Sequence, residues 1–391
     1  MREGWKEERL GDLTSKIGSG VTPRGGSSVY INSGTTLIRS QNIYNGYFDK
    51  GGLVYINDET AQKMSNVELI EDDVLINITG DSVARCTTVP KNILPARINQ
   101  HVSILRCIKE RINPKFLKYT LISPYYQAVL LSIATGAGAT RNALTKSILE
   151  DFKINLPPLP TQQRIAELLS GYDDLIENNL KRIKILEEMA QQTYEEWFVR
   201  MRFPGYESAV INPETGLPKG WEKVKLGEIS DFKYGSMQKK ENIVDSGYPV
   251  FSGYRNTGFS SKYNVSKKSL IVVARGVGGT GDVKFTPQKC WLTNLSILLS
   301  LNNDEFINYL YYYLKAANLR TLDSGAAQSQ ITIVSLEPFP IVTPDIQIIR
   351  KFNSLVEPLF KSIENLQNQN QRLREARDIL LPRLMMGMIE V

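Results

Sequence analysis

The chain has 391 residues, and its 47 lysines and arginines exceed its 41 acidic residues, giving a formal net charge of +6. Hydrophobic residues make up 42% of the sequence, which is ample for the cores of two or more domains. No apolar run approaches the roughly 18 residues of a membrane span, and the N-terminus does not read as a secretory signal. Three scattered cysteines, Cys86, Cys107 and Cys290, and one histidine, His101, leave no candidate zinc site and favour a cytoplasmic location.

Two stretches of the sequence, 161–203 and 345–391, share one helical pattern at an offset of 187 residues. Apolar residues recur every three or four positions in both, which is typical of helices that bury one stripe against another helix. The alternative is that each helix packs only on its own domain. The predicted coiled-coil seam consists of Ile165, Leu169, Ile176, Asn179, Ile183, Leu186, Phe352, Leu359, Ile363, Asn370, Leu373 and Leu380.

If these helices pair antiparallel, the numbers of facing residues have a constant sum. Placing Asn179 opposite Asn370 sets that sum at 549 and puts a pseudo-twofold axis near the middle of both helices. A polar pair within an apolar seam fixes register and orientation at some cost in stability. The alternative is that either asparagine is simply solvated at the edge of the seam.

The regions outside the helices are duplicated too. Gly4-Trp5 followed by Leu10-Gly11 returns 216 positions later as Gly220-Trp221 followed by Leu226-Gly227, whereas the offset near the ends of these regions is 187. Both regions mix strand-like and helix-like runs, which predicts mixed α/β domains. The predicted organisation is a globular domain at 1–160, a helix at 161–203, a second globular domain at 204–344 that opens with a linker at 204–219, and a helix at 345–391.

Polar loops between the predicted strands are the candidate binding surface. Arg, Asn and Gln hydrogen-bond base edges, and glycine lets the backbone approach phosphate closely. Polar loops occur in any protein, so ordinary solvation is the alternative for each residue. Outside the two helices there are 34 basic and 27 acidic residues, and this positive balance suits a polyanionic partner. The candidate DNA contacts are Arg24, Arg39, Gln41, Asn42, Arg85, Arg141, Lys239, Arg255, Asn256, Arg275 and Gln328.

Catalytic motifs are incomplete in this sequence. The glycine-rich run 276–281 lacks the Gly-Lys-Ser/Thr ending of a nucleotide-binding loop. The run 123–126, Ser-Pro-Tyr-Tyr, lacks the second proline of an amino-methyltransferase loop. Because the chain has only one histidine, its two halves cannot both carry a histidine as general acid or base. We therefore expect no catalytic residue, no metal site and no cofactor in this chain.

Over essentially its full length the chain resembles the specificity (S) subunit of Type I restriction-modification systems. The repeated Gly-Trp and Leu-Gly openings carry this resemblance, as does the run 157–166, Pro-Pro-Leu-Pro-Thr-Gln-Gln-Arg-Ile-Ala. The corresponding run in the second half, at 343–350, also leads into a predicted long helix but has a different sequence. The difference concerns the boundary of the second helix.

The resemblance implies a mixed α/β fold in which two target recognition domains with twisted β-sheets are separated by two long antiparallel coiled-coil helices. It implies that each domain reads one half of a split site in double-stranded DNA. Two modification subunits, which bind S-adenosylmethionine and methylate adenine, would dock on the helices, and restriction subunits would join them to cleave DNA. This chain would itself be non-catalytic. The alternatives are a protein-binding scaffold and a self-contained DNA-modifying enzyme with degenerate motifs.

Overall fold

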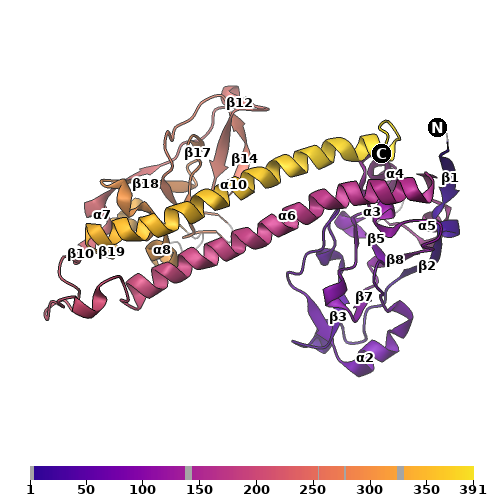
Figure 1. The fold of residues 1–391 in the computed structure, drawn as a ribbon, viewed down its shortest axis with the longest axis horizontal. Coiled ribbons are helices and arrows are strands. Elements are labelled where there is room, and N and C mark those ends of the chain that lie inside the picture. Colours follow the sequence, from indigo (N-terminus) through magenta and orange to yellow (C-terminus); the bar gives the residue numbers. More distant parts are fainter. Residues whose placement is uncertain (1–3, 137–142, 254, 277–278, 324–329) are drawn as a thin grey trace. The chain divides into compact units, whose positions relative to one another are not determined.

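The computed structural model describes residues 4–136, 143–253, 255–276, 279–323 and 330–391. The chain forms two compact units: unit 1 is Met1–Asn179 with Asn368–Val391, and unit 2 is Leu180–Gln367. Two long helices, α6 (Leu159–Tyr194) and α10 (Ile346–Met385), supply residues to both units (Figure 1). Each unit therefore takes in part of both helices in addition to its own sheets. The expected fold class, mixed α/β with two long paired helices, is confirmed.

The described residues of unit 1 form three sheets. A four-stranded antiparallel sheet has the order β2 (Thr14–Ser19), β8 (Val102–Cys107), β5 (Val74–Asn77) and β6 (Cys86–Thr88). A three-stranded sheet has the order β4 (Val54–Ile56), β3 (Thr35–Ile38) and β7 (Ala96–Ile98), and β1 (Lys6–Arg9) pairs with β9 (Lys153–Leu156). The helices are α1 (Leu10–Leu13), α2 (Asp58–Lys63), α3 (Pro114–Ile122), α4 (Pro124–Thr135) and α5 (Lys146–Asp151).

Unit 2 repeats this plan. Its first four-stranded sheet has the order β11 (Ser230–Tyr234), β18 (Ser296–Leu301), β15 (Leu270–Val273) and β16 (Val283–Phe285). Its second has the order β12 (Ile243–Val244), β14 (Arg255–Ser260), β13 (Tyr248–Ser252) and β17 (Trp291–Leu292), and β10 (Glu222–Lys225) pairs with β19 (Pro340–Thr343). The helices are α7 (Leu226–Ile229), α8 (Ile307–Ala316) and α9 (Ile333–Leu336), and a π-helical turn at Glu195–Val199 ends α6.

The repeated Leu-Gly opening has a physical reason in both units. Gly11 lies against α5, where an added Cβ atom would be 3.0 Å from the carbonyl oxygen of Glu150. Gly227 lies in the same way against Glu337, whose carbonyl oxygen would be 3.2 Å from an added Cβ. Glycine permits this close backbone approach, and any larger residue would push the segments apart.

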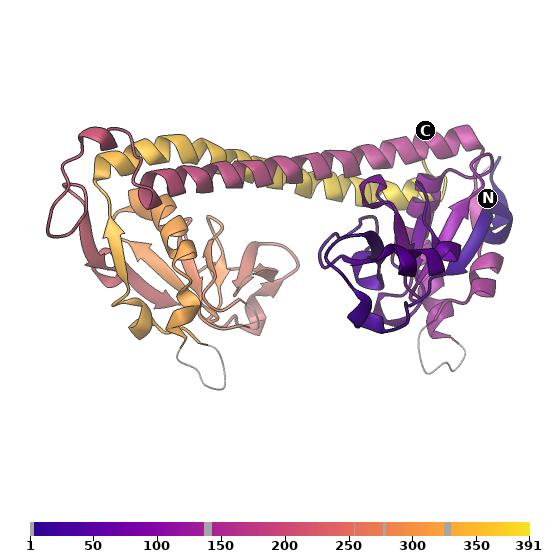
Figure 2. The same ribbon diagram turned by 90° about the horizontal axis from the view of Figure 1, so that it is seen from below.

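The ends of the long helices belong to the domain cores. Leu381, Leu384 and Met385 of α10 join Ile165 and Leu169 of α6 in the main hydrophobic core of unit 1. Figures 1 and 2 both show the C-terminal end of α10 beside the N-terminal part of α6 in this unit. In unit 2 the roles are exchanged, because the end of α6 and the beginning of α10 enter the core there.

The two helices pack antiparallel. In unit 1 the Asn179 Nδ2 atom donates a hydrogen bond of 2.9 Å to Asn370 Oδ1, so the residue numbers of this pair add to 549. In unit 2, Ile183 forms a buried cluster with Ile363 and Leu366. Ile165, Leu169, Ile176, Asn179, Ile183, Phe352, Ile363 and Asn370 are buried, whereas Leu186, Leu359, Leu373 and Leu380 are half-buried.

A partly buried ionic network joins three helices of unit 1. The Asp173 carboxylate on α6 accepts hydrogen bonds from Lys118 Nζ at 3.2 Å, from Tyr119 Oη at 2.5 Å and from Arg377 Nη1 at 2.7 Å. Burial raises the pKa of Asp173, but the Lys118 charge and the bonds from Tyr119 and Arg377 outweigh burial and hold that pKa below its usual value. The carboxylate is therefore ionised at neutral pH and ties α6 to α3 and α10.

Candidate nucleic-acid interface

The topology of unit 1 brings several loops to one edge of its sheets. Strands β2 and β5 end at this edge, and β8, antiparallel to both, begins there. Strand β3 runs parallel to β7, and the Asn99 N–H donates to the Ile38 carbonyl at 3.0 Å, so the segments after both strands reach the same edge. We call the segments 20–24, 39–42, 79–85 and 99–101 the edge loops of unit 1.

Unit 2 has the matching edge. Strands β11 and β15 end there and β18 begins there, and the Thr293 N–H donates to the Phe251 carbonyl at 3.0 Å. Within the described residues, the segments 235–236, 253, 255–256, 274–276 and 293–295 gather at this edge. We call these segments the edge loops of unit 2.

The same glycine contact begins the first edge loop of each unit. A Cβ atom at Gly20 would lie 2.1 Å from the Ile98 carbonyl oxygen, and one at Gly235 would lie 2.2 Å from the Thr293 carbonyl oxygen. Neither distance is physically possible, so only glycine lets the strand end cross its neighbour so closely. The duplicated frame therefore extends to this edge, where the residues that follow differ between units.

Each edge carries an arginine whose side chain has an unsatisfied donor. Arg39 donates from Nη2 to the Gly52 carbonyl at 2.6 Å, and its guanidinium lies 5.6 Å from the ring centroid of Tyr30. The Nε atoms of Arg39 and Arg275 are buried and have no hydrogen-bond partner. Buried donors are nearly always paired, and an ordered water is the ordinary partner of a buried donor that no protein atom reaches.

Arg85 lies on another edge loop of unit 1. Its guanidinium carbon is 4.8 Å from the ring centroid of Tyr44, and Tyr44 stacks on Tyr47. No carboxylate of the described residues forms an ion pair with Arg85. Its charge is therefore available to an anionic ligand.

The other predicted contacts are placed unequally. Arg24, Gln41, Arg255 and Asn256 are exposed on the edge loops, and Arg85 and Arg275 are half-buried. Lys239 is exposed too, but it follows Gln238, which bonds to Phe259 near the other end of β14. Arg141 and Gln328 lie outside the described residues.

Asn42 differs from the prediction, because its side chain is fully buried. It donates to the carbonyls of Asp49 and Gly51 at 3.0 and 3.1 Å and accepts from the Arg39 N–H at 3.1 Å. With both ends of its amide used inside the protein, Asn42 shapes the loop that carries Arg39 and cannot reach a base.

Sequence reasoning missed the aromatic and imidazole groups of this edge. Tyr30, Tyr44 and Tyr47 lie beside the predicted arginines, and the Thr79 hydroxyl is 2.6 Å from His101 Nδ1. A signal was available, since tyrosines within polar, glycine-rich loops have no core to enter and are enriched at binding surfaces.

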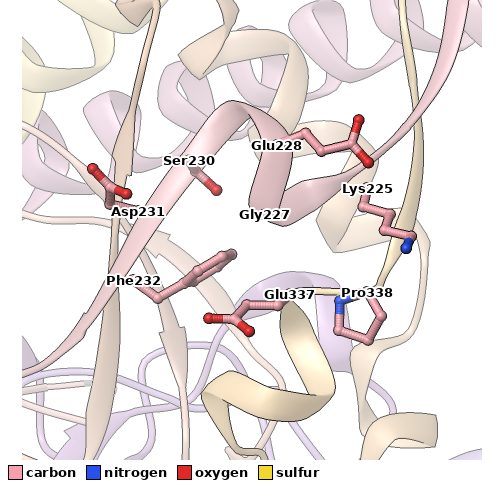
Figure 3. Close-up of a pocket in the computed structure, with 8 residues that line it drawn as sticks. All are labelled: Lys225, Gly227, Glu228, Ser230, Asp231, Phe232, Glu337 and Pro338. Atoms are coloured by element: carbon pink, nitrogen blue, oxygen red, sulfur yellow. The ribbon is translucent and has the colours of Figure 1, made fainter.

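The opposite end of β11 carries negative charge. A pocket of about 510 Å³ lies there, lined by Lys225 and by three carboxylates, those of Glu228, Asp231 and Glu337 (Figure 3). An acidic surface repels phosphate, so the pocket end of this sheet is unsuited to DNA. The arginines on the edge loops of unit 2 lie at the other end, which gives the unit a polarity suited to docking one edge on a polyanion.

No group of three or more His, Cys, Asp or Glu residues in the described parts of the chain is arranged to hold a metal ion. Within these same ranges, no helix is both long enough and apolar enough to cross a membrane.

Comparison with known proteins decides the family. The family model described as the Type I restriction modification DNA specificity domain matches residues 2–188 and then residues 218–375. The chain belongs to this Type I DNA specificity family. The resemblance found in the sequence is thereby confirmed, and the two matches correspond to the two copies of the internal repeat.

Individual members of the specificity family agree with this result. The chain is 29% identical over 307 residues to the Type I restriction enzyme MjaIX specificity subunit of Methanocaldococcus jannaschii, covering 72% of this chain and 71% of that protein. It is 23% identical over 467 residues to the HindI specificity subunit of Haemophilus influenzae, covering 98% of this chain and 99% of that protein. The crystal structure of the Type I S subunit from M. genitalium matches with a TM-score of 0.65 and 18% identity, covering 97% and 96% of the two chains, and so shares the fold.

Proposed function

We propose that this chain is the sequence-specific DNA-recognition subunit of a Type I restriction-modification complex, and that each unit reads one half of a bipartite site. Family membership supports this function. The single observation that links the function to particular residues is that both units have the same edge. In both units a glycine contact of the same geometry leads into polar loops, and each edge holds an arginine with a buried, unpaired Nε atom.

The side chains on the edge loops favour DNA over polyanions that have no bases to hydrogen-bond. Arginine can bind guanine O6 and N7 with two donors, and exposed Gln41 and Asn256 can pair with adenine. The two edges carry different side chains on the same frame, which is the arrangement expected of two readers with different targets. Phosphate contacts from Arg24 and Arg255 would set the position of each unit.

We further propose that methyltransferase subunits dock on α6 and α10, with restriction subunits joining the assembly. The chain would contribute no catalytic group and no cofactor, and S-adenosylmethionine would be held by the methyltransferase partner. Its place would be the cytoplasm, where the genome is accessible.

The proposal is tested by mapping methylated adenines in cells with and without this chain. The expected result is one split motif that is fully methylated with the chain present and unmethylated without it. An unchanged methylation map, in cells that express the partner subunits, would contradict the proposal. The same map identifies the two half-sites.

A further inference from the structure

Two tyrosines of unit 1 form a stacked pair beside the edge loops. The rings of Tyr44 and Tyr47 have centroids 4.8 Å apart and planes 10° apart. Arg85 places its guanidinium carbon 4.8 Å from the Tyr44 centroid, and no other ring of the described residues is in contact with Tyr47. Because Tyr47 is 56% exposed, the pair presents an open aromatic surface next to a fixed positive charge.

The turn that carries the pair is held firmly. The Tyr44 N–H donates to the Tyr47 carbonyl at 3.2 Å, and the Gly46 N–H donates to the Cys86 carbonyl at 3.0 Å. The Asn45 side chain accepts from the Cys86 N–H at 3.2 Å, so both residues at the tip are fastened to β6. Gly46 has a φ of +83°, which other residues adopt only with strain. A ring fixed in this way loses little freedom when it binds a ligand.

Packing does not account for the exposed ring. Tyr47 is not a member of the hydrophobic cores of unit 1, and neither tyrosine hydroxyl has a hydrogen-bond partner among the described residues. Partial burial of the Tyr47 side chain raises its pKa, and the nearby Tyr44 and Asp49 side chains raise it further. The phenol is thus neutral at physiological pH and does not repel phosphate.

We propose that Tyr47 stacks on a nucleobase at a base step that opens within the half-site read by unit 1. This inference rests on the proposed function. Bases of an intact duplex have both faces covered by their neighbours, so an exposed ring can stack only where a step is opened or a base is extruded. Every base offers a π-face, and a guanidinium beside the ring supplies the contact to the flanking phosphate.

The test uses the complete complex of this chain with its partner subunits and a duplex that carries the mapped motif. Tyr47→Ala should weaken binding at least about fivefold, the lower end of the range for one base–aromatic stack. Tyr47→Phe keeps the ring and should bind within about twofold of wild type. Tyr125→Ala is the matched control, because Tyr125 is 57% exposed on α4 of the same unit, and it should also bind as wild type.

A second measurement tests the opened step. A mismatch placed in the unit 1 half-site lowers the cost of unstacking, so it should tighten binding of the wild-type complex and have a smaller effect on Tyr47→Ala. Unchanged binding by Tyr47→Ala overturns the inference, as does equal weakening by Tyr47→Phe, which would indicate a hydroxyl contact. A variant that assembles poorly with the partner subunits but binds DNA normally once assembled would assign the ring to a protein partner and would also overturn it.

The proposed function is judged separately by the same assay. A wild-type complex that does not prefer the motif over a scrambled duplex contradicts the function and the inference together. A wild-type complex that prefers the motif while Tyr47→Ala is unaffected contradicts the inference alone. Equal thermal midpoints of wild type and Tyr47→Ala show that the comparison is between folded proteins.

Discussion

Asn179 on α6 donates to Asn370 on α10, and the Nδ2 atom of Asn370 is buried without a partner. The pair thus satisfies only part of its hydrogen-bonding capacity. An alternative register would move one asparagine against aliphatic side chains and leave even this bond unmade. The pair therefore favours one register at the expense of stability.

The first prediction concerns this pair. Asn179→Leu leaves Asn370 with no partner for either amide atom and should lower the free energy of unfolding by about 1–3 kcal/mol. The double variant Asn179→Leu/Asn370→Leu removes both polar groups and should be at least as stable as wild type. Chemical denaturation monitored by helical circular dichroism measures both. A double variant less stable than the single one would contradict this account of the seam.

The second prediction concerns the Asp173 network. Asp173→Asn removes the charge that faces buried Lys118 and Arg377, and it should destabilise unit 1 by about 2–3 kcal/mol, a figure reduced for partial exposure. Glu59→Gln is the control, since it removes an exposed ion pair with Lys63 in the same unit. Equal stability of Asp173→Asn and the control would contradict the role given to the network.

The pH dependence follows from the same carboxylate. The folded-state pKa of Asp173 lies below its ordinary value, so the unfolded chain binds the proton more readily. The stability it contributes is full above the ordinary aspartate pKa of about 3.9 and is lost as pH falls through the lower folded-state pKa. Acid titration of Asp173→Asn should therefore show a shallower loss of stability in this window than wild type. Identical acid profiles would count against the assignment.

The fourth prediction compares two glycines of β2 and its end. Gly20→Ala would place a methyl group against the Ile98 carbonyl and should cost about 1–3 kcal/mol or more. Gly18→Ala meets no atom within 4 Å and should be neutral. Thermal unfolding of both variants decides the matter, and equal midpoints would show that the close strand crossing is not needed.

Local patterns in the sequence were sufficient for the long helices and for the duplicated frame. Helix periodicity needs only the spacing of Ile165, Leu169 and Ile176, and the repeat offset places Asn179 and Asn370 near the middle of both helices. Glycines such as Gly11 and Gly227 could be matched by position, but the carbonyl that each approaches lies in a distant segment. Their purpose therefore became clear only from tertiary structure.

The candidate site was less predictable, because the role of each polar side chain depends on partners far away in the sequence. Asn42 and Gln41 are adjacent and chemically alike, yet only Gln41 is exposed. Tyr44 and Arg85 are 41 positions apart and meet only because the turn at Gly46 is bonded to β6. Residue type identified the chemistry of the edge, whereas tertiary contacts determined which members of it face outward.

The central claim is that two edges of one chain read two separate half-sites. The most direct test is to map methylated adenines in cells carrying Arg39→Ala, Arg275→Ala or the control Lys63→Ala on α2. We predict that Arg39→Ala relaxes or abolishes recognition in one half of the split motif, that Arg275→Ala does so in the other half, and that the control leaves both halves unchanged. Loss of one bidentate arginine contact is worth about 1–3 kcal/mol of discrimination, enough to be visible in such a map. If both arginine variants changed the same half, or if neither changed the motif, the account would be contradicted.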